Sequence, residues 1–182
     1  MDYDSFSHGQ IKSKLWLCEK LEPYLPNGCT IQILGSWYNV LGFMLSVRNP
    51  DKYKLIQGID ISIEAVNIAN KINNYWTMDN SIQNVNNDAN NLSYIPDSIV
   101  INCSPEHFEN TQWFDNIPSG TTVCIQSSSM TDKEYPWYIK QPTPNMHSFL
   151  EKYPLTVIHY NDTLDIKYDD WGYSRYMIIG VK

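Results

Sequence analysis

The chain has 182 residues, of which 42% are hydrophobic and 18% charged, and its formal net charge is −7 at pH 7. This length suits one domain, residues 1–182, with a buried core, and the acidic balance disfavours broad binding to nucleic acid, which needs clustered lysine and arginine. No apolar run approaches the roughly 18 to 20 residues of a membrane span, and the polar start Met-Asp-Tyr-Asp-Ser-Phe-Ser does not suit a signal peptide. We therefore expect a soluble, cytoplasmic protein that does not bind membranes.

Several residue types that often mark special sites are scattered here. Lys12, Lys14 and Lys20 could form a small basic patch, or simply the solvated face of a helix. The four cysteines have no C-x-x-C spacing, which favours reduced, buried thiols over a disulfide framework or a zinc site. The four histidines are dispersed as well, so the sequence predicts no metal site.

The first pattern along the chain is helical. Apolar residues recur at helical spacing over Gln10–Leu25, which gives a lead-in helix within residues 1–28 that lies against the sheet or over the site. A short apolar strand, Thr30–Leu34, then stops at Gly35, and helical spacing resumes over Val40–Val47. Strand, tight turn and helix in this order open a βαβ unit.

A second strand repeats the arrangement. Lys54–Ile59 is apolar and ends on Asp60, and Ser62 could cap a helix over Ile63–Ile72. An acid at the tip of the second strand, about 20 residues after a glycine turn, is where nucleotide-binding folds place the acceptor for ribose hydroxyls. Asp60 could also be only a solvated acid at a strand end.

The middle of the chain supplies three more strands. An Asn-rich passage holds a weaker, partly polar strand that begins at Ile82 and ends near Asp88. Asp97–Cys103 and Gly120–Gln126 have the composition of buried central strands. Residues 127–144 are polar and punctuated by prolines, and a loop of that length in a small domain is usually functional or disordered.

The last segment predicts a hairpin. A short helix, Met146–Tyr153, precedes strands at Leu155–Tyr160 and Tyr173–Val181, which Asp169–Gly172 could join. The whole pattern predicts an α/β fold: a Rossmann-like, doubly wound, mostly parallel seven-stranded sheet with an antiparallel C-terminal strand. Residues 29–182 would form this core, and ligands of such sheets bind at the carboxyl ends of the strands.

Four segments resemble motifs of the class I S-adenosylmethionine-dependent methyltransferases, and the resemblance covers most of the chain from about Thr30 onward. They are Gly58–Lys71, which is the most specific, Asn87–Leu92, Asp97–His107 and Tyr173–Gly180. The resemblance implies S-adenosyl-L-methionine as cofactor, with Asp60 on the ribose, Asp88 on the adenine amine and the backbone N–H of Ala89 on the adenine ring.

A narrower resemblance involves the start of the chain. Gly9–Leu17, Leu34–Tyr38 and Asn102–His107 together look like a group of small, phage-type methyltransferase-like proteins of unassigned substrate. If the protein is phage-encoded, its expected location is the cytoplasm of the host.

The first motif departs from the family's pattern. That motif usually has three glycines and an acid two places before the first of them, whereas here the acid's place is Ile33 and the second and third glycine places are Trp37 and Asn39. Bulky side chains limit the close approach of a ligand to the backbone. Cofactor binding by this loop must therefore differ from the family's or be lost, and Trp37 could wall the cofactor, plug the core or be an exposed loop aromatic.

The predicted cofactor-binding residues lie at or just after the carboxyl ends of strands. They are Gly35, Ser36, Trp37, Asp60, Ile61, Asp88, Ala89, Asn102 and Cys103. Asp88, in an Asn-rich loop, could instead be a turn former.

Catalysis is expected from Asn102, Glu106 and His107, after the fourth strand. Glu106 and His107 could form an acid–base pair, because histidine titrates near neutral pH, or Glu106 could be an acid in the first turn of a helix. The expected acceptor contacts are Gln10, Ser13, Lys14, Gln126 and Ser127. The segment Tyr135–Pro144 could close over the acceptor as a lid.

These residues favour S-adenosylmethionine-dependent methyl transfer to a small or modestly sized acceptor. Such a transfer needs alignment of nucleophile, methyl carbon and sulfur, and removal of any proton on the nucleophile. An alternative is a non-catalytic Rossmann-like protein that binds the nucleoside or S-adenosylmethionine through a degenerate glycine loop. An NAD-dependent enzyme is a weaker third reading, because the G-x-G-x-x-G fingerprint is absent.

Overall fold

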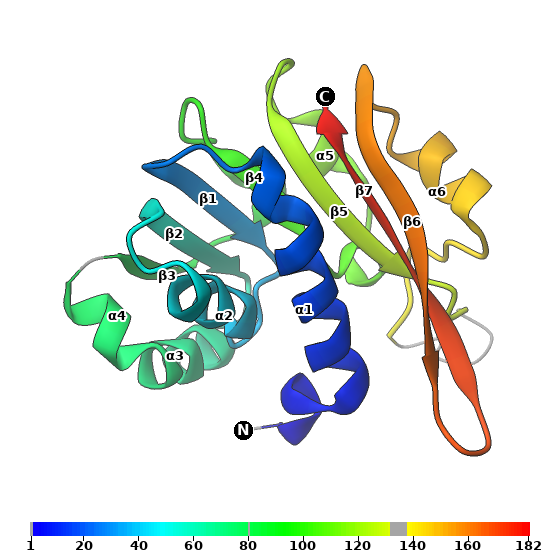
Figure 1. Cartoon of the computed structure of the whole chain (residues 1–182), viewed down its shortest axis with the longest axis horizontal. Coiled ribbons are helices and arrows are strands. Elements are labelled where there is room, and N and C mark those ends of the chain that lie inside the picture. The colour runs from blue at the N-terminus through cyan, green and yellow to red at the C-terminus, as the bar shows by residue number, and fades with distance from the viewer. Residues whose placement is uncertain (1, 80, 132–137) are drawn as a thin grey trace.

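A computed structural model describes residues 2–79, 81–131 and 138–182 of the chain. They form one seven-stranded sheet in the order β3-β2-β1-β4-β5-β7-β6 (Figure 1). The strands are β1 (Cys29–Leu34), β2 (Tyr53–Asp60), β3 (Ile82–Asn86), β4 (Ile99–Asn102), β5 (Thr122–Ser128), β6 (Val157–Lys167) and β7 (Gly172–Val181). The α-helices of the described residues are α1 (His8–Leu21), α2 (Val40–Arg48), α3 (Ile63–Ile72), α4 (Asn74–Met78), α5 (Gln112–Asp115) and α6 (Met146–Lys152).

The pairing confirms the predicted sheet. Strands β1 to β5 run parallel to one another, whereas β7 is antiparallel to both β5 and β6. Helices cover both faces, because each central strand is apolar on both sides. Within the described residues, no helix is long and apolar enough to cross a membrane.

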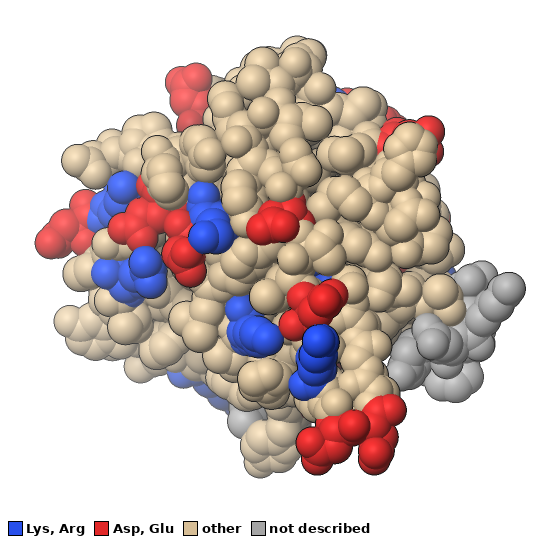
Figure 2. Space-filling model, turned by 45° about the vertical axis from the view of Figure 1, so that its right-hand side comes forward, with Lys and Arg blue, Asp and Glu red and all other residues tan. Residues whose placement is uncertain are grey.

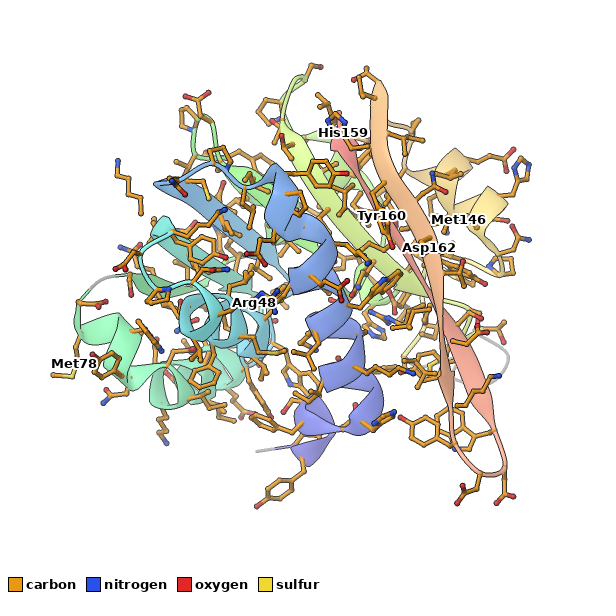
Figure 3. The ribbon with its side chains drawn as sticks, in the orientation of Figure 1. Arg48, Met78, Met146, His159, Tyr160 and Asp162 are labelled. Atoms are coloured by element: carbon orange, nitrogen blue, oxygen red, sulfur yellow. The ribbon has the colours of Figure 1, made fainter. Side chains whose placement is uncertain are left out.

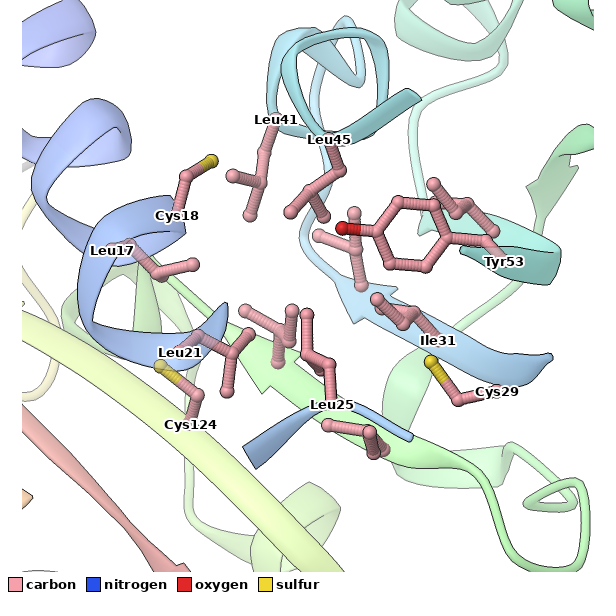
Figure 4. Packing of buried hydrophobic residues seen from close by; sticks show 14 of the residues in the cluster. Leu17, Cys18, Leu21, Leu25, Cys29, Ile31, Leu41, Leu45, Tyr53 and Cys124 are labelled. Atoms are coloured by element: carbon pink, nitrogen blue, oxygen red, sulfur yellow. The ribbon is translucent and has the colours of Figure 1, made fainter. Parts of the chain in front are cut away.

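The core has two layers, one on each face of the sheet. In β4, Ile101 packs with α1 and α2, whereas its neighbour Val100 packs on the opposite face with Trp113 of α5 and Phe149 of α6. Side chains of a strand alternate between faces, so a strand buried on both sides reads as a continuous apolar run. Figure 4 shows the first layer, where Leu17 and Leu21 of α1 lie near Leu41 and Leu45 of α2, with Ile31 of β1 beside them.

The first helix is shifted from its predicted bounds. It begins at His8 because the Ser7 side chain accepts a hydrogen bond from the Gln10 backbone N–H, and it ends in a 3-10 turn, Glu22–Tyr24, that contains Pro23. In Figure 1, α1 lies across the front of the sheet, and its first turns reach the edge toward which β1 and β2 point. That placement lets the lead-in helix cover a site at the carboxyl ends of the strands.

Strand β6 is longer than the predicted Leu155–Tyr160. It pairs with β7 from Val157 to Lys167 at the edge of the sheet. Most of its side chains are exposed, including His159 and Asp162, and Tyr160 donates a hydrogen bond to Asp162 (Figure 3). Because this strand lacks the apolar pattern that marks a buried strand, its second half could not be read from the sequence.

The four cysteines are free in the structure. We expect all four to react with a thiol reagent after denaturation without reductant. In the native protein the reaction should be slow, because three of the thiols are buried and burial raises the pKa of Cys103 to about 11. A count below four after denaturation would contradict a reducing compartment.

Candidate active site

A cavity of about 680 Å³ opens at the carboxyl edge of the sheet. Loops after β1, β2, β3 and β4 line it, together with α1, β7 and Tyr138. This volume is within the range of small-molecule sites. The predicted site residues on its wall are Gln10, Lys14, Gly35, Ser36, Trp37, Asp60, Ile61, Asp88, Ala89, Cys103, Glu106 and His107.

The loop after β1 has an unusual backbone. Gly35, Trp37 and Asn39 have φ angles of 58°, 52° and 49°, which lie in the left-handed region. These are the three places that the family's motif fills with glycine, and non-glycine residues adopt this conformation rarely. Gly35 is also required by space, because a Cβ there would lie 2.9 Å from the side chains of Ser104 and Phe108.

Asn39 fits where a glycine is expected because a neighbouring strand provides the space. Its side chain is buried, accepts a hydrogen bond from the Gly42 backbone N–H and donates one to Asn84. A Cβ on Gly58 of β2 would lie only 2.5 Å from the Asn39 side-chain nitrogen. Gly58 on β2 thus leaves room for the Asn39 side chain at a loop position where a glycine is expected. The Asn39 side chain also caps the N-terminus of α2.

Asp60 connects the loop to β2. One carboxylate oxygen accepts a hydrogen bond from the Trp37 backbone N–H at 2.7 Å, and the other accepts one from the Ser62 N–H at 2.9 Å. A carboxylate offers about four acceptor positions, so each oxygen can still accept from a ligand hydroxyl. Asp60 is therefore more than a solvated strand end: it holds the loop and also lines the cavity.

Asp88 is a turn former that also lines the cavity. Its side chain accepts a hydrogen bond from the Asn90 backbone N–H and caps the 3-10 turn Ala89–Asn91, as a turn former does. It also lines the cavity beside Ala89. The Asn87 N–H donates to the Asp60 carbonyl, which keeps the ends of β3 and β2 together.

A buried ion pair closes the other end of the cavity. Glu106 and Arg175 are 2% and 6% exposed, and Oε1 of Glu106 lies 3.0 Å from Nη1 of Arg175. Arg175 also donates to the Cys103 carbonyl at 2.6 Å, and Ser127 donates to the second Glu106 oxygen at 3.4 Å. Both carboxylate oxygens are thus engaged, which fits an anchoring role better than proton transfer.

Arg175 is a site residue that was not predicted from the sequence. It stands in β7 among buried, mostly apolar residues, where a charged side chain is almost always paired. That composition was the available signal, but the partner, Glu106, lies 69 residues earlier in the chain.

His107 has a fixed hydrogen-bonding arrangement. Its Nδ1 lies 2.8 Å from the Tyr138 carbonyl oxygen, and the two rings lie with centroids 4.0 Å apart. A carbonyl can only accept, so Nδ1 carries a proton, and in the neutral ring the lone pair is on Nε2. His107 also lines the cavity.

Lys14 reaches the cavity from α1. Its ammonium donates to the Gln10 side-chain oxygen at 2.5 Å. Burial lowers the pKa of Lys14 to about 8. Two neighbours have smaller effects: Cys103 raises this pKa and Arg175 lowers it. Gln10 and Lys14 both line the cavity.

Four residues that were predicted to belong to the site do not line the cavity: Ser13, Asn102, Gln126 and Ser127. Gln126 is 0% exposed and donates to the Ser13 carbonyl, so both residues belong to the packing of α1 on β5. Ser127 lies behind Glu106. Asn102 is fully buried, and its side chain accepts from the Ser104 N–H, which shapes the turn after β4.

The proposed lid, Tyr135–Pro144, is described only in part, because residues 132–137 lie outside the described residues. The remainder follows the cavity wall. The backbone N–H groups of Lys140 and Gln141 both donate to the Glu106 carbonyl, and the hydroxyl oxygens of Ser127 and Thr143 lie 3.2 Å apart. Tyr138 therefore stays against His107 as part of the wall.

Charge on the surface is mixed. Figure 2 shows lysine and arginine dispersed among acidic residues on one face, with no continuous basic patch there. Within the described residues, no cluster of histidine, cysteine, aspartate and glutamate could hold a metal ion.

No protein-family model matches the chain, and no curated protein matches it. Solved structures do. The N-methyltransferase NodS of Bradyrhizobium japonicum, solved with S-adenosyl-l-homocysteine, matches with a TM-score of 0.69 and 12% identity over 94% of this chain and 87% of that chain. The YcgJ protein of Bacillus subtilis matches with a TM-score of 0.69 and 11% identity over 94% of this chain and 98% of that chain. A geranyl diphosphate methyltransferase solved with SAM matches with a TM-score of 0.67 and 11% identity over 93% of this chain and 84% of that chain. The chain thus has the class I methyltransferase fold.

Proposed function

We propose that this protein transfers a methyl group from S-adenosyl-L-methionine to a small acceptor. The observation that carries the proposal is the succession of Asp88, Asp60 and the Gly35 loop along one cavity, at the ends of the adjacent strands β3, β2 and β1. Adenine would lie at Asp88 and Ala89, and ribose at Asp60. The methionine part would lie between Gly35 and Cys103, with its methyl group toward β4.

The charge of the wall supports this cofactor. The acidic lining residues are Asp2, Asp60, Asp88, Glu106 and Glu109, against two basic ones, Lys14 and Arg175. S-adenosylmethionine carries a positive sulfonium, which methyl transfer converts to a neutral thioether. An acidic cavity attracts the charged cofactor more strongly than the spent one, which favours exchange after each turnover.

The chemistry requires little beyond alignment and a proton acceptor. The lone pair of the nucleophile would attack the methyl carbon as the carbon–sulfur bond breaks and its electron pair returns to sulfur. A proton on the nucleophile would pass to Nε2 of His107, whose tautomer the Tyr138 carbonyl sets. Glu106 would keep Arg175 and the turn after β4 in place.

Cofactor binding is the direct test. Calorimetric titration should show S-adenosylmethionine and S-adenosylhomocysteine binding with micromolar affinity, and no binding of NAD. Binding without any transfer of tritiated methyl groups into a low-molecular-weight cell extract would favour a non-catalytic binding protein. Absence of binding by either nucleoside would overturn the proposal.

His107→Gln should lower the rate of methyl transfer by about 100-fold or more, the usual effect of losing a general base. Cofactor affinity should stay within about twofold, because His107 lies on the acceptor side. Both are measurable, by transfer of labelled methyl groups and by calorimetry. His147→Gln on α6 is the matched control, since that side chain is exposed, and equal rates for the two variants would rule out His107 as the base.

A further inference from the structure

The acceptor end of the cavity contains a cation that forms no ion pair within the part of the chain that the structure describes. Lys14 lines the wall, and within the described residues its ammonium donates a hydrogen bond to the neutral side chain of Gln10. No carboxylate among the described residues forms an ion pair with it. Arg175, the other cation on this wall, is by contrast paired with Glu106 at 3.0 Å. Lys14 is half-buried. Partial removal of an ammonium from water without a counterion costs free energy, so such a group favours an anion in the adjacent space.

The neighbours of Lys14 do not neutralise it. The groups that influence it are Cys103 after β4, Arg175 on β7, Asp4 and Cys18. Both thiols are neutral near pH 7, because burial raises the pKa of Cys103 to about 11 and that of Cys18 to about 12. Asp4 is an exposed residue of the N-terminal 3-10 turn and forms no ion pair with Lys14.

The position of Lys14 separates it from the adenosine end. Of its neighbours, Cys103 follows β4 and Arg175 is in β7. Asp60 and Asp88 lie at the ends of β2 and β3, on the other side of β1 in the sheet. Lys14 and His107 therefore belong to the same half of the cavity. A molecule in this half would meet a fixed positive charge and a proton acceptor together.

We propose that the methyl acceptor is a small carboxylate, whose anionic group binds the ammonium of Lys14 while its hydroxyl, amine or thiol faces Nε2 of His107. The inference rests on the proposed function and names its substrate class. A charge-assisted hydrogen bond between ammonium and carboxylate is short and strong in a site that excludes water. Arg175 adds positive potential nearby but remains held by Glu106 and the Cys103 carbonyl.

Binding of the carboxylate should depend on pH in a defined direction. The anion stabilises the protonated form of Lys14, so its pKa must rise above about 8 when the carboxylate binds. The affinity is thus fully present below pH 8 and should fall by up to about tenfold per pH unit above it, as free Lys14 loses its proton.

The test is NMR of the protein labelled with lysine carrying ¹³C at Cε, with the Lys14 signal identified by its absence in Lys14→Met. Its pH titration is followed alone, with S-adenosylhomocysteine, and with 5′-methylthioadenosine, which lacks the carboxylate. Acetate and benzoate are then added to the S-adenosylhomocysteine complex. We expect S-adenosylhomocysteine and 5′-methylthioadenosine to have the same effect on the pKa of Lys14. At least one of the two small carboxylates should raise that pKa. That carboxylate should bind at least about tenfold more weakly to Lys14→Met but normally to Lys20→Met, whose lysine is on the exposed part of the same helix.

Two results would overturn the inference. If S-adenosylhomocysteine raises the pKa of Lys14 and 5′-methylthioadenosine does not, then Lys14 binds the methionine carboxylate of the cofactor. If neither acetate nor benzoate moves the Lys14 signal, the acceptor half does not bind carboxylates through this residue. In both cases nucleoside binding itself is unaffected, so the proposed function would stand, whereas a protein that binds neither nucleoside fails the proposed function instead.

Discussion

Arg175→Met should lower the free energy of unfolding by about 3–5 kcal/mol, because it leaves the Glu106 carboxylate buried without its counterion. Glu106 is 2% exposed, and among the described residues Ser127 donates the other hydrogen bond to its carboxylate. The Cys103 carbonyl also loses a donor. Urea unfolding at pH 7, followed by circular dichroism, measures the loss.

Two further variants separate this effect from lost packing. The double variant Glu106→Gln with Arg175→Met removes both charges and should regain most of the lost stability, since neutral replacement of a buried pair is often tolerated. Arg48→Met breaks the exposed pair with Glu22, at 2.9 Å, and should cost no more than about 1 kcal/mol. Equal losses for Arg175→Met and Arg48→Met would show that the buried pair contributes nothing special.

Asp60→Ala should weaken S-adenosylhomocysteine binding by about 100-fold or more. Two ribose hydroxyls would lose a charged acceptor, at about 1.5–3 kcal/mol for each hydrogen bond. The backbone N–H groups of Trp37 and Ser62 lose their acceptor as well, so the left-handed loop becomes less well ordered. Calorimetry gives the affinity, and Asp51→Ala, at an exposed turn before β2, is the control.

Asp60→Asn distinguishes the two roles of this carboxylate. The amide keeps one oxygen, so it can accept from one backbone N–H but not bind two ribose hydroxyls. We expect near-normal stability and weakened nucleoside binding. If Asp60→Asn and Asp60→Ala both bind S-adenosylhomocysteine like the parent, Asp60 is only an anchor of the loop and the ribose assignment fails.

The fold could be predicted because it depends on local patterns. Apolar runs such as Ile99–Asn102 mark strands buried on both faces, and the order of strands and helices then permits few arrangements. The end of each strand also locates Asp60 and Asp88. The conformation of Trp37 and Asn39 was hidden, because it depends on hydrogen bonds to Asp60 and on space beside Gly58 rather than on the residues themselves.

The acceptor side was less predictable for a geometric reason. Successive residues of a strand face opposite sides, and the sequence did not show which side of β5 faced the cavity. Gln126 lies on the side of Cys124, under α1, whereas Ser127 lies near Glu106. The pair Glu106–Arg175 depends on a contact across 69 positions, which no local pattern reveals.

Both ends of the chain contribute to the same cavity, and this has a consequence for its biosynthesis. Lys14 comes from the first helix and Arg175 from the last strand, and the Gly9 backbone N–H donates to the hydroxyl of Tyr168, at 3.2 Å. During translation, α1 and the strands β1 to β3, at whose ends adenosine is proposed to bind, leave the ribosome first. The acceptor half cannot form until β7 inserts between β5 and β6. In the proposed function, the acceptor side of the site is therefore completed only after Arg175 has been synthesised, near the end of translation.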